Sequence, residues 1–354
     1  QIREKGRLAR DERGERIPDG KGGWRRIPGM LKECKAVGWI IPEYGRAQVS
    51  INLTDHEVTG MHDAFEAVDS VARKAGVRVT GSEVVGLVPL EAILSSGRHF
   101  LASRGESRGI PDRAVVDAAI RSLGLCEVGP FDPERKIVEY RLSPRGRLVS
   151  ESLDAFTAEL SLDTPAPGGG SVAALAGALG AALAAMVANL TFAKKGFETS
   201  RASMEEIAMD AQGLRGRLLD AVDRDAEAFD RVMAARRMPS GTDAEKEARA
   251  LAVQEATRGA ARVPLEVMEL GVRVLDLAWK AVEEGIAGSV TDGGVGGLVG
   301  LACVVGAHWN VLANLKGIRD ASFVEETGAA AAALRARAEQ AGARIRGRLD
   351  EKLG

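Results

Sequence analysis

Apolar and polar positions in the first 142 residues follow a mixture of strand-like and helix-like spacings. Residues 37–41 form a short apolar run, and residues 47–53 alternate strictly between apolar and polar side chains. This alternation predicts a core face and a polar face, the polar one carrying Gln48, Ser50 and Asn52. A helix is expected from a cap at Thr59 to about Lys74, with further strands over 76–89 and 137–142. These patterns predict an α/β fold for this half of the chain.

After residue 142 the strand pattern stops and long Ala- and Leu-rich helical patterns continue to the C-terminus. The segment Ser143–Ser150 is charged and rich in turn-forming residues, as is typical of a junction. We expect two domains, a partial α/β domain over residues 1–146 and an all-α bundle over residues 147–354.

The most apolar segment of the second half covers residues 172–190, where only Asn189 is polar. Its length would allow a membrane crossing, but nine of its nineteen residues are Ala and two are Gly, which gives weak transfer energy. The small residues Gly177, Gly180 and Ala184 are spaced for close helix contact. We expect no membrane span here, but a buried central helix or a dimer seam. Residues 288–307 predict a similar interior helix.

Composition and charge exclude several classes of protein. The 354 residues carry 48 Lys and Arg against 50 Asp and Glu, so a polycation that binds nucleic acid is disfavoured. Three cysteines without a CxxC pair argue against a disulfide framework or a thiolate zinc site, and a cytoplasmic location is expected. No signal peptide opens the chain, and its start at Gln1 leads us to expect missing upstream sequence.

A glycine-rich segment leads into the apolar helix and is the first candidate binding element. Two prolines precede Gly168, Gly169 and Gly170, and Ser171 is available as an N-cap. Glycine leaves backbone N–H groups open to a ligand at the positive end of the helix dipole. A tight turn made for close packing explains the segment equally well. Nucleotide binding is disfavoured, because no strand precedes the segment and it lacks a phosphate-loop lysine.

The helix expected over residues 214–233 offers one candidate catalytic acid. Leu218, Val222, Phe229 and Met233 form one apolar stripe, and Asp225 lies within it. A carboxylate that faces a core has a raised pKa suited to proton transfer, although a buried ion pair or a helix-cap role fits the spacing equally well. The other four acids of this helix are expected to face solvent: Asp220, Asp223, Glu227 and Asp230.

Other polar residues near the predicted helix ends are weaker candidates for substrate binding. They are Lys194, Lys195, Asp292, Asn310, Asn314 and Lys316. Lysines at a helix end most often complement its dipole in solvent. The four histidines show no metal-ligand spacing, so no metal site is predicted. Ser171 has no evident base, and covalent catalysis is not indicated.

Long motifs in both halves resemble the bifunctional formimidoyltransferase-cyclodeaminases. Residues 27–142 resemble the C-terminal part of the glutamate formimidoyltransferase domain, through Ala47-Gln-Val-Ser-Ile-Asn-Leu-Thr54 and Gly81-Ser-Glu-Val-Val-Gly-Leu-Val-Pro89. Residues 150–354 resemble the cyclodeaminase domain, through Pro167-Gly-Gly-Gly-Ser-Val-Ala173, Val222-Asp-Arg-Asp-Ala226 and Asn310-Val-Leu-Ala-Asn-Leu-Lys316.

The resemblance implies an all-helical, dimer-forming cyclodeaminase that converts 5-formimidoyltetrahydrofolate to 5,10-methenyltetrahydrofolate and ammonia. Asp225 matches the catalytic aspartate of the family. The Gly168–Ser171 loop would shape the pterin pocket, and Lys194, Lys195 or Lys316 would hold polar groups of a folate, including its glutamate tail. The folate is the substrate, and no tightly bound cofactor is expected.

The resemblance also implies that the first half of the transferase domain is absent, together with its catalytic histidine. Transfer would then require a separate N-terminal transferase subdomain, although Gln48 and Asn52 are candidates to line the remaining folate cleft. Two other functions stay open. One is methenyltetrahydrofolate cyclohydrolase activity on the same product, and the other is a non-catalytic folate-binding scaffold.

Overall fold

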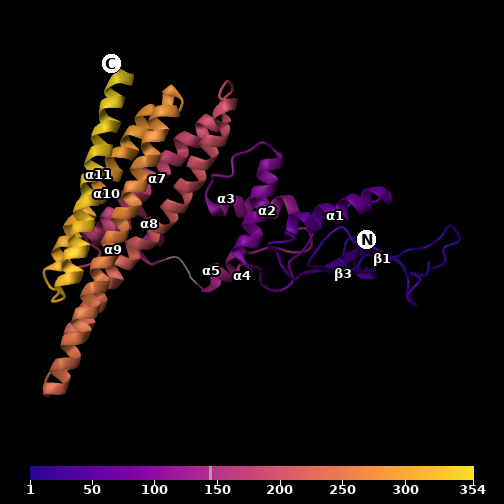
Figure 1. Cartoon of the computed structure of the whole chain (residues 1–354), viewed down its shortest axis with the longest axis horizontal. Helices are drawn as coiled ribbons and strands as arrows, with labels where there is room; N and C mark the ends of the chain where they lie inside the picture. The colour runs from indigo at the N-terminus through magenta and orange to yellow at the C-terminus, as the bar shows by residue number, and fades with distance from the viewer. Residues whose placement is uncertain (143–145) are drawn as a thin grey trace. The chain divides into compact units, whose positions relative to one another are not determined.

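The computed structural model describes residues 1–142 and 146–354, which form two compact units. Unit 1 comprises Gln1–Glu106 and Asp112–Pro144, and unit 2 comprises Ser107–Pro111 and Arg145–Gly354 (Figure 1). The predicted junction over 143–150 falls partly on residues 143–145, outside the described residues. Each unit has its own helices, and strands occur within unit 1 among the described residues.

Unit 1 begins with two small antiparallel hairpins. The first pairs β1 (Arg7–Leu8) with β2 (Arg26–Ile27), and the second pairs β3 (Cys34–Ile41) with β4 (Arg46–Leu53) in a register that sets Trp39 opposite Gln48. The core face predicted for residues 47–53 is only partly formed. Val49 is 41% exposed, because this sheet has only two strands. Large apolar side chains on β3 are likewise exposed, namely Val37, Trp39 and Ile40.

After the hairpins, unit 1 contains the helices α1 (Met61–Lys74), α2 (Leu90–Ser103), α3 (Asp112–Leu123), α4 (Pro133–Lys136) and α5 (Val138–Leu142), joined by irregular segments. The extent of α1 confirms the prediction, but its cap is Gly60, and Thr59 instead donates a 2.7 Å hydrogen bond to the Lys32 carbonyl.

The two later strands predicted for this half are wrong. The segment over 76–89 contains a single bridge, between Val88 and Ile137, and residues 138–142 are helical. Positive φ angles at Gly76 and Gly86 turn the backbone at two points of the predicted first strand, so an extended ladder does not form.

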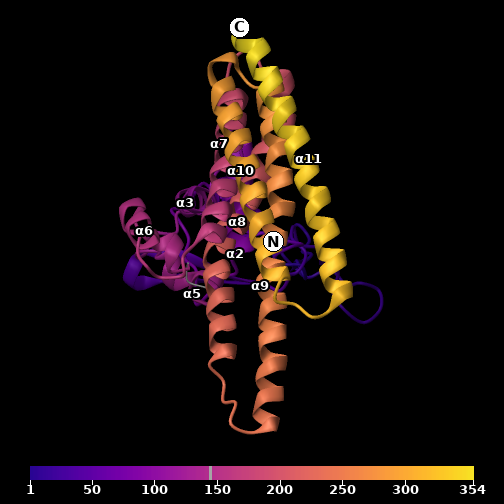
Figure 2. The same ribbon diagram turned by 90° about the vertical axis from the view of Figure 1, so that its left-hand side faces the viewer.

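Unit 2 is helical, as predicted for the second half. A short α6 (Leu153–Leu160) precedes five long helices that run side by side (Figure 2). These are α7 (Gly169–Ala193), α8 (Arg201–Arg236), α9 (Asp243–Glu284), α10 (Val290–Leu315) and α11 (Ala321–Leu353). Short 3-10 turns lie at Leu148–Ser150 (η2), Glu198–Ser200 (η3) and Ala287–Ser289 (η4).

Small residues bring the central helices of unit 2 close together. A Cβ on Gly177 would lie 2.7 Å from Cys303 Sγ, and one on Gly180 would lie 2.8 Å from the Gly296 carbonyl oxygen. Real Cβ atoms do not approach so closely, so the backbone contact at Gly180 requires glycine, whereas a Cβ on Gly177 would force the Cys303 side chain to shift. Gly177 and Gly180 therefore line a seam within the bundle, where α7 packs against α10 and α8.

Two segments of unit 2 are long and apolar enough to cross a membrane by length and composition. They are Gly169–Ala193, whose most apolar window is 61% buried, and Ala287–Leu315, whose window is 44% buried. Core helices of soluble proteins pass the same test. The absence of a membrane span therefore stays a prediction.

Candidate functional site

The N-terminus of α7 meets the side of α8 at Asp225. Ser171, in the first turn of α7, is fully buried, and its hydroxyl lies 2.9 Å from the Val222 carbonyl and 3.3 Å from Asp225 Oδ2. Asp225 itself is half-buried, and it sits at the positive end of the α7 dipole. Asp225, which the sequence places within the apolar stripe of its helix, thus packs against α7.

The predicted role of Ser171 as N-cap is wrong. Gly168 is the N-cap and makes no side-chain cap bond, while Ser171 lies inside the helix. The helix begins earlier than expected because Gly169 and Gly170 already have helical geometry. The Ser171 hydroxyl therefore points across to α8 rather than back along its own helix.

The environment of Asp225 favours its protonated form. Burial raises its pKa above the ordinary value of 3.8, while the hydroxyl and backbone N–H of Ser171 partly oppose this shift. The Ser171 hydroxyl has one proton, and the Val222 carbonyl can only accept it. When that proton is donated to Val222, Ser171 Oγ is free to accept a hydrogen bond from a protonated Asp225.

Of the three loop glycines, only Gly170 lies where a Cβ would meet the Asp225 carboxylate. A Cβ on Gly170 would lie 2.2 Å from Asp225 Oδ1. The same atom on Gly168 or Gly169 would meet its nearest neighbour at 3.7 or 3.8 Å, which is ordinary contact. The neighbour of Gly169 is Asn310 Nδ2, so α10 also reaches this end of α7.

The C-terminal end of α10 adds further polar groups. Asn310 donates to the Gly306 carbonyl, and Asn314 donates to the Ala260 carbonyl of α9, both at 2.9 Å. Lys316 is exposed at the C-cap. A cavity of about 630 Å³ opens against the following loop and α9, with Gln254, Arg258, Arg319 and Asp320 in its lining. Gln254 joins the two sides through bonds with Gly317 and Arg319.

The structure separates the remaining candidates of this half from Asp225. Lys194 and Lys195 follow the last turn of α7, and a 25-residue helix is ~36 Å long. Asp292 lies in the first turn of α10, which runs antiparallel to α7, because Gly306 lies against Ala173 and Gly296 against Gly180. Within one chain, these three residues therefore occupy the opposite end of the bundle from Asp225.

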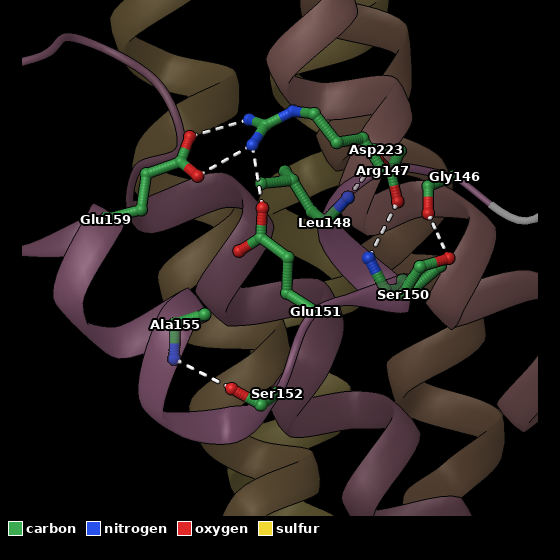
Figure 3. A network of polar contacts seen from close by, with 10 residues as sticks. Gly146, Arg147, Leu148, Ser150, Glu151, Ser152, Ala155, Glu159 and Asp223 are labelled. Atoms are coloured by element: carbon green, nitrogen blue, oxygen red, sulfur yellow. Dashed lines mark hydrogen bonds and ion pairs between the residues drawn. The ribbon is translucent and has the colours of Figure 1, made fainter.

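Asp223 has a role that its position along the helix does not reveal. Its carboxylate accepts the backbone N–H of Leu148 at 2.8 Å and that of Val149 at 3.3 Å (Figure 3). A Cβ on Gly146 would lie 2.2 Å from this carboxylate. The prediction that Asp223 faces solvent is thus wrong, because it holds the first turn of η2. These acceptor bonds join segments about 75 residues apart, which helix spacing does not reveal.

An arginine clamp secures the same segment. Arg147 forms a two-pronged ion pair with Glu159, with both contacts at 2.6 Å, and a third contact of 2.7 Å with Glu151 (Figure 3). Ser152 caps α6 by accepting the Ala155 N–H. These contacts hold residues 147–159 together, and the Asp223 bonds to Leu148 and Val149 tie this segment to α8 two residues before Asp225.

Gln48 and Asn52 lie on β4 of unit 1. Gln48 is half-buried and donates a 2.7 Å bond to Glu83, whereas Asn52 is exposed and lies opposite Lys35 in the hairpin. Because the side-chain amide of Gln48 is hydrogen-bonded to Glu83, the polar face of β4 is partly paired within unit 1.

Unit 1 also brings together two histidines that the sequence keeps apart. His62 of α1 stacks on His99 of α2 with 4.3 Å between ring centroids, and His99 contacts Glu66 at 2.9 Å. Burial lowers the pKa of His62. In residues 1–142 and 146–354, no group of three His, Cys, Asp or Glu side chains is placed to hold a metal ion.

Comparison with known proteins assigns a family to this arrangement. The formiminotransferase-cyclodeaminase family model matches residues 152–333, which contain the α7–α8 site, and the formiminotransferase domain model matches residues 1–143. The chain belongs to the formiminotransferase-cyclodeaminase family. The family of the two halves is thus the one that the sequence motifs indicate.

The similar proteins match different parts of the chain. Formimidoyltransferase-cyclodeaminase of Mus musculus is 36% identical over 85% of this chain, and the chain spans 56% of the length of that relative. A methenyltetrahydrofolate cyclohydrolase of Methylorubrum extorquens is 41% identical over 177 residues, which are 50% of this chain and 85% of that protein. The crystal structure of formiminotetrahydrofolate cyclodeaminase from Thermotoga maritima is 30% identical with a TM-score of 0.52, and the match covers 58% of this chain and 98% of that one.

Proposed function

We propose that unit 2 is a formimidoyltetrahydrofolate cyclodeaminase, which converts 5-formimidoyltetrahydrofolate to 5,10-methenyltetrahydrofolate and ammonia. The observation that carries the proposal is the half-buried Asp225 carboxylate, with its raised pKa, at the N-terminus of α7. The similarity of unit 2 to the Thermotoga maritima cyclodeaminase supports it.

The chemistry needs one group that takes a proton and gives it back. N10 of the folate attacks the formimidoyl carbon, and the adduct then carries an amino group that must leave as ammonia. A proton therefore departs from N10, and the leaving nitrogen must gain protons before its bond to carbon breaks. A carboxylic acid whose pKa lies closer to neutrality than usual can serve both transfers, typically for a rate gain of about 10²–10⁴.

Asp225 is suited to this task because some features of its surroundings raise its pKa and others lower it. Burial favours the acid form, while the Ser171 N–H and the α7 dipole keep the carboxylate form accessible. In our proposal, the Gly168–Ser171 turn forms the wall of the pterin site, and Gly170 keeps the space beside the carboxylate free of a Cβ.

For the rest of the folate we propose the C-terminal end of α10. Asn314, Lys316 and the cavity beside Arg258 and Arg319 lie on the side of the bundle where α10 ends, as does Asn310 next to Gly169. Lys316 and Arg319 there suit a carboxylate-rich glutamate tail, whereas Arg258 is already paired with Asp320 and Glu255, and Glu247 also lines the cavity. Lys194 and Lys195 of the same chain lie too far from Asp225 for this role.

Turnover of 5-formimidoyltetrahydrofolate tests the proposal. Ammonia release and methenyltetrahydrofolate absorbance should appear together with the native chain. Asp225→Asn should lower the rate by about 100-fold or more, because an amide cannot exchange the proton. Asp230→Asn, at an exposed position of the same helix, is the matched control and should keep the native rate. Folate binding without turnover by the native chain would contradict the proposal and support a non-catalytic scaffold.

A second candidate function is methenyltetrahydrofolate cyclohydrolase activity. It is supported by the 41% identity to the Methylorubrum extorquens cyclohydrolase over most of that protein. Methenyltetrahydrofolate as sole substrate separates the two reactions, because its hydrolysis consumes the absorbance without releasing ammonia. We propose deamination as the main reaction, so consumption of the methenyl compound should be the slower of the two.

For unit 1 we propose a contribution to folate binding through Asn52 and the exposed side of the β3–β4 hairpin. Its similarity to the formiminotransferase domain supports this role. We also propose that the protein acts as a homo-oligomer in the cytoplasm.

A further inference from the structure

The first hairpin of unit 1 carries two tight turns that are exposed to solvent. Between β1 and β2 the chain turns once over residues 11–15 and again over residues 19–23, and an isolated bridge closes each turn. Figure 1 shows this stretch as the indigo loops beside β1. We call residues 7–27 the basic arm, because its exposed side chains are mainly arginines.

Backbone hydrogen bonds give the basic arm a defined shape. The Ala9 N–H donates to the Arg25 carbonyl, and the Arg25 N–H donates to the Ile17 carbonyl. The Ile17 N–H donates to the Ala9 carbonyl, which completes a cycle of bonds of 2.8–3.1 Å. At the two tips, Asp11 and Asp19 each accept two backbone N–H groups at 2.8–2.9 Å. Because the arm is preformed, a ligand that binds it orders little additional backbone.

The basic arm holds positive charge in a chain whose other residues are net acidic. It has seven basic and four acidic side chains, whereas the whole chain has 48 basic and 50 acidic ones. The basic residues are Arg7, Arg10, Arg13, Arg16, Lys21, Arg25 and Arg26, and all seven are exposed. The acids are Asp11, Glu12, Glu15 and Asp19. The charge balance of the whole chain, which disfavours a polycation, therefore conceals a local excess of three positive charges.

The cations of the arm are not neutralised within the protein. Among the described residues, no carboxylate forms an ion pair with any of the seven. Arg10 donates to the Gly14 carbonyl and Arg26 donates to the Lys5 carbonyl, and both of these acceptors are uncharged. The positive charges thus remain available to an external anion, and seven of them on one short arm suit a ligand with several negative charges.

The chemistry of these side chains favours a nucleic acid strand over other polyanions. Six of the seven cations are arginines, whose planar guanidinium donates paired hydrogen bonds to phosphate oxygens. Trp24 is 47% exposed, and the Arg16 guanidinium lies 5.9 Å from the centre of its ring. Both groups offer flat surfaces on which bases stack. An acidic polypeptide such as polyglutamate would match the charges but leave this stacking surface unused.

We propose that the basic arm binds a single-stranded nucleic acid, with its guanidinium groups on the phosphates and a base stacked on Trp24. Arg13 and Lys21 occupy the same place in the two turns, two residues after Asp11 and Asp19, so each tip presents one cation to the strand. Contacts to phosphates carry no base identity, so binding depends little on sequence. The proposal concerns unit 1 and does not rest on deamination by unit 2.

Fluorescence anisotropy with the full chain tests the proposal, using labelled RNA and DNA strands of about 15 nucleotides and the same sequence. Both should bind, and the tighter one identifies the preferred sugar. Affinity should fall between about 50 and 200 mM salt, with a log–log slope of about −0.7 for each phosphate contacted. The double variant Arg13→Gln, Lys21→Gln should bind about 10-fold more weakly, and its slope should be shallower by about 1.4. Trp24→Leu should also bind about 10-fold more weakly, with the slope unchanged.

The matched control removes the same two kinds of charge from exposed positions elsewhere in unit 1. Lys74→Gln, Arg78→Gln should bind with native affinity and slope. Arg13→Lys, Lys21→Arg keeps both charges and should also bind like the native chain. Unchanged far-UV circular dichroism should confirm that the variants fold, since the turns are held by the backbone N–H groups of residues 13 and 21.

Three results would each overturn the proposal. They are no binding by the native chain at about 50 mM salt, equal losses in the arm and control variants, and a native slope in Arg13→Gln, Lys21→Gln. Displacement of the strand by poly-L-glutamate at equal charge concentration, together with native affinity in Trp24→Leu, would overturn it in favour of an acidic polypeptide.

Discussion

Gly170 and Asp225 approach so closely that a Cβ on the glycine would lie 2.2 Å from the Oδ1 of the aspartate. This contact joins the first turn of α7 to the middle of α8. The Asp225 carboxylate, which belongs to α8, lies against the positive N-terminal end of the α7 dipole. The geometry that stabilises the helix start thus also fixes the acid that we propose as catalytic.

Gly170→Ala should therefore disturb both folding and catalysis. The added methyl group forces the carboxylate or the α7 turn to move, and overpacking of this kind costs about 1–3 kcal/mol. We expect a lower melting temperature and a reduced deamination rate. The control is Gly169→Ala, whose Cβ would lie 3.8 Å from Asn310 Nδ2 and should leave stability unchanged or slightly raised. Equal effects of the two substitutions would rule out the steric role of Gly170.

The raised pKa of Asp225 predicts how stability depends on pH. The folded state holds the proton more tightly than the unfolded chain, so this group favours folding most below the ordinary pKa of 3.8. Its contribution declines as pH rises through the folded-state pKa, by about 1.4 kcal/mol for each unit of difference. Asp225→Asn cannot ionise. Its stability relative to the native chain should consequently increase between pH 3.8 and the folded-state pKa, then level off.

Chemical denaturation at a series of pH values measures the difference in the free energy of unfolding between Asp225→Asn and the native chain. Asp230→Asn, which replaces an exposed acid on the same helix, is the matched control. If the stability difference between Asp225→Asn and the native chain follows that of the control at every pH, or if it falls with rising pH, then burial does not dominate at Asp225.

Sequence patterns predicted the helical half well because its signals are local. The uninterrupted apolar run of α7 and the stripe that contains Asp225 depend only on residues a few positions apart. The strands expected at 76–89 and 137–142 failed for the opposite reason. Alternation predicts a strand only if a partner supplies hydrogen bonds, and here the backbone turns at Gly76 and Gly86 and leaves one bridge.

The site was predictable only in part for a similar reason. Asp225 could be selected from its own helix, but its partner Ser171 lies 54 residues away, and the Asp223 acceptor bonds span 75 residues. Whether a lysine lies near Asp225 or at the opposite end of the bundle depends on how the antiparallel helices pack against one another. The sequence therefore grouped Lys194 and Lys195 with residues that lie a full helix length away.

Asp223 should matter for stability and not for the chemical step. Asp223→Ala leaves the N–H groups of Leu148 and Val149 without their acceptor and should lower the free energy of unfolding by about 1–2 kcal/mol. Thermal denaturation measures the loss, and the kcat of the folded variant should stay close to native. Asp230→Ala is the control and should change stability by less than about 0.5 kcal/mol. A large drop in kcat at unchanged stability would instead place Asp223 in the reaction.

Lysines at the two ends of the bundle should differ in their effect on folate binding. Lys316 lies six residues after Asn310, the α10 neighbour of Gly169, so Lys316→Ala should raise the KM for a folate with a glutamate tail by about 10-fold. The rate at saturation should change little, because the lysine holds the tail and not the reacting carbon. The double variant Lys194→Ala, Lys195→Ala should leave KM unchanged, since these side chains follow the far end of α7. Initial-rate kinetics on both variants decide the point: a raised KM in the double variant with a native value in Lys316→Ala would reverse the proposed direction of the substrate along the bundle.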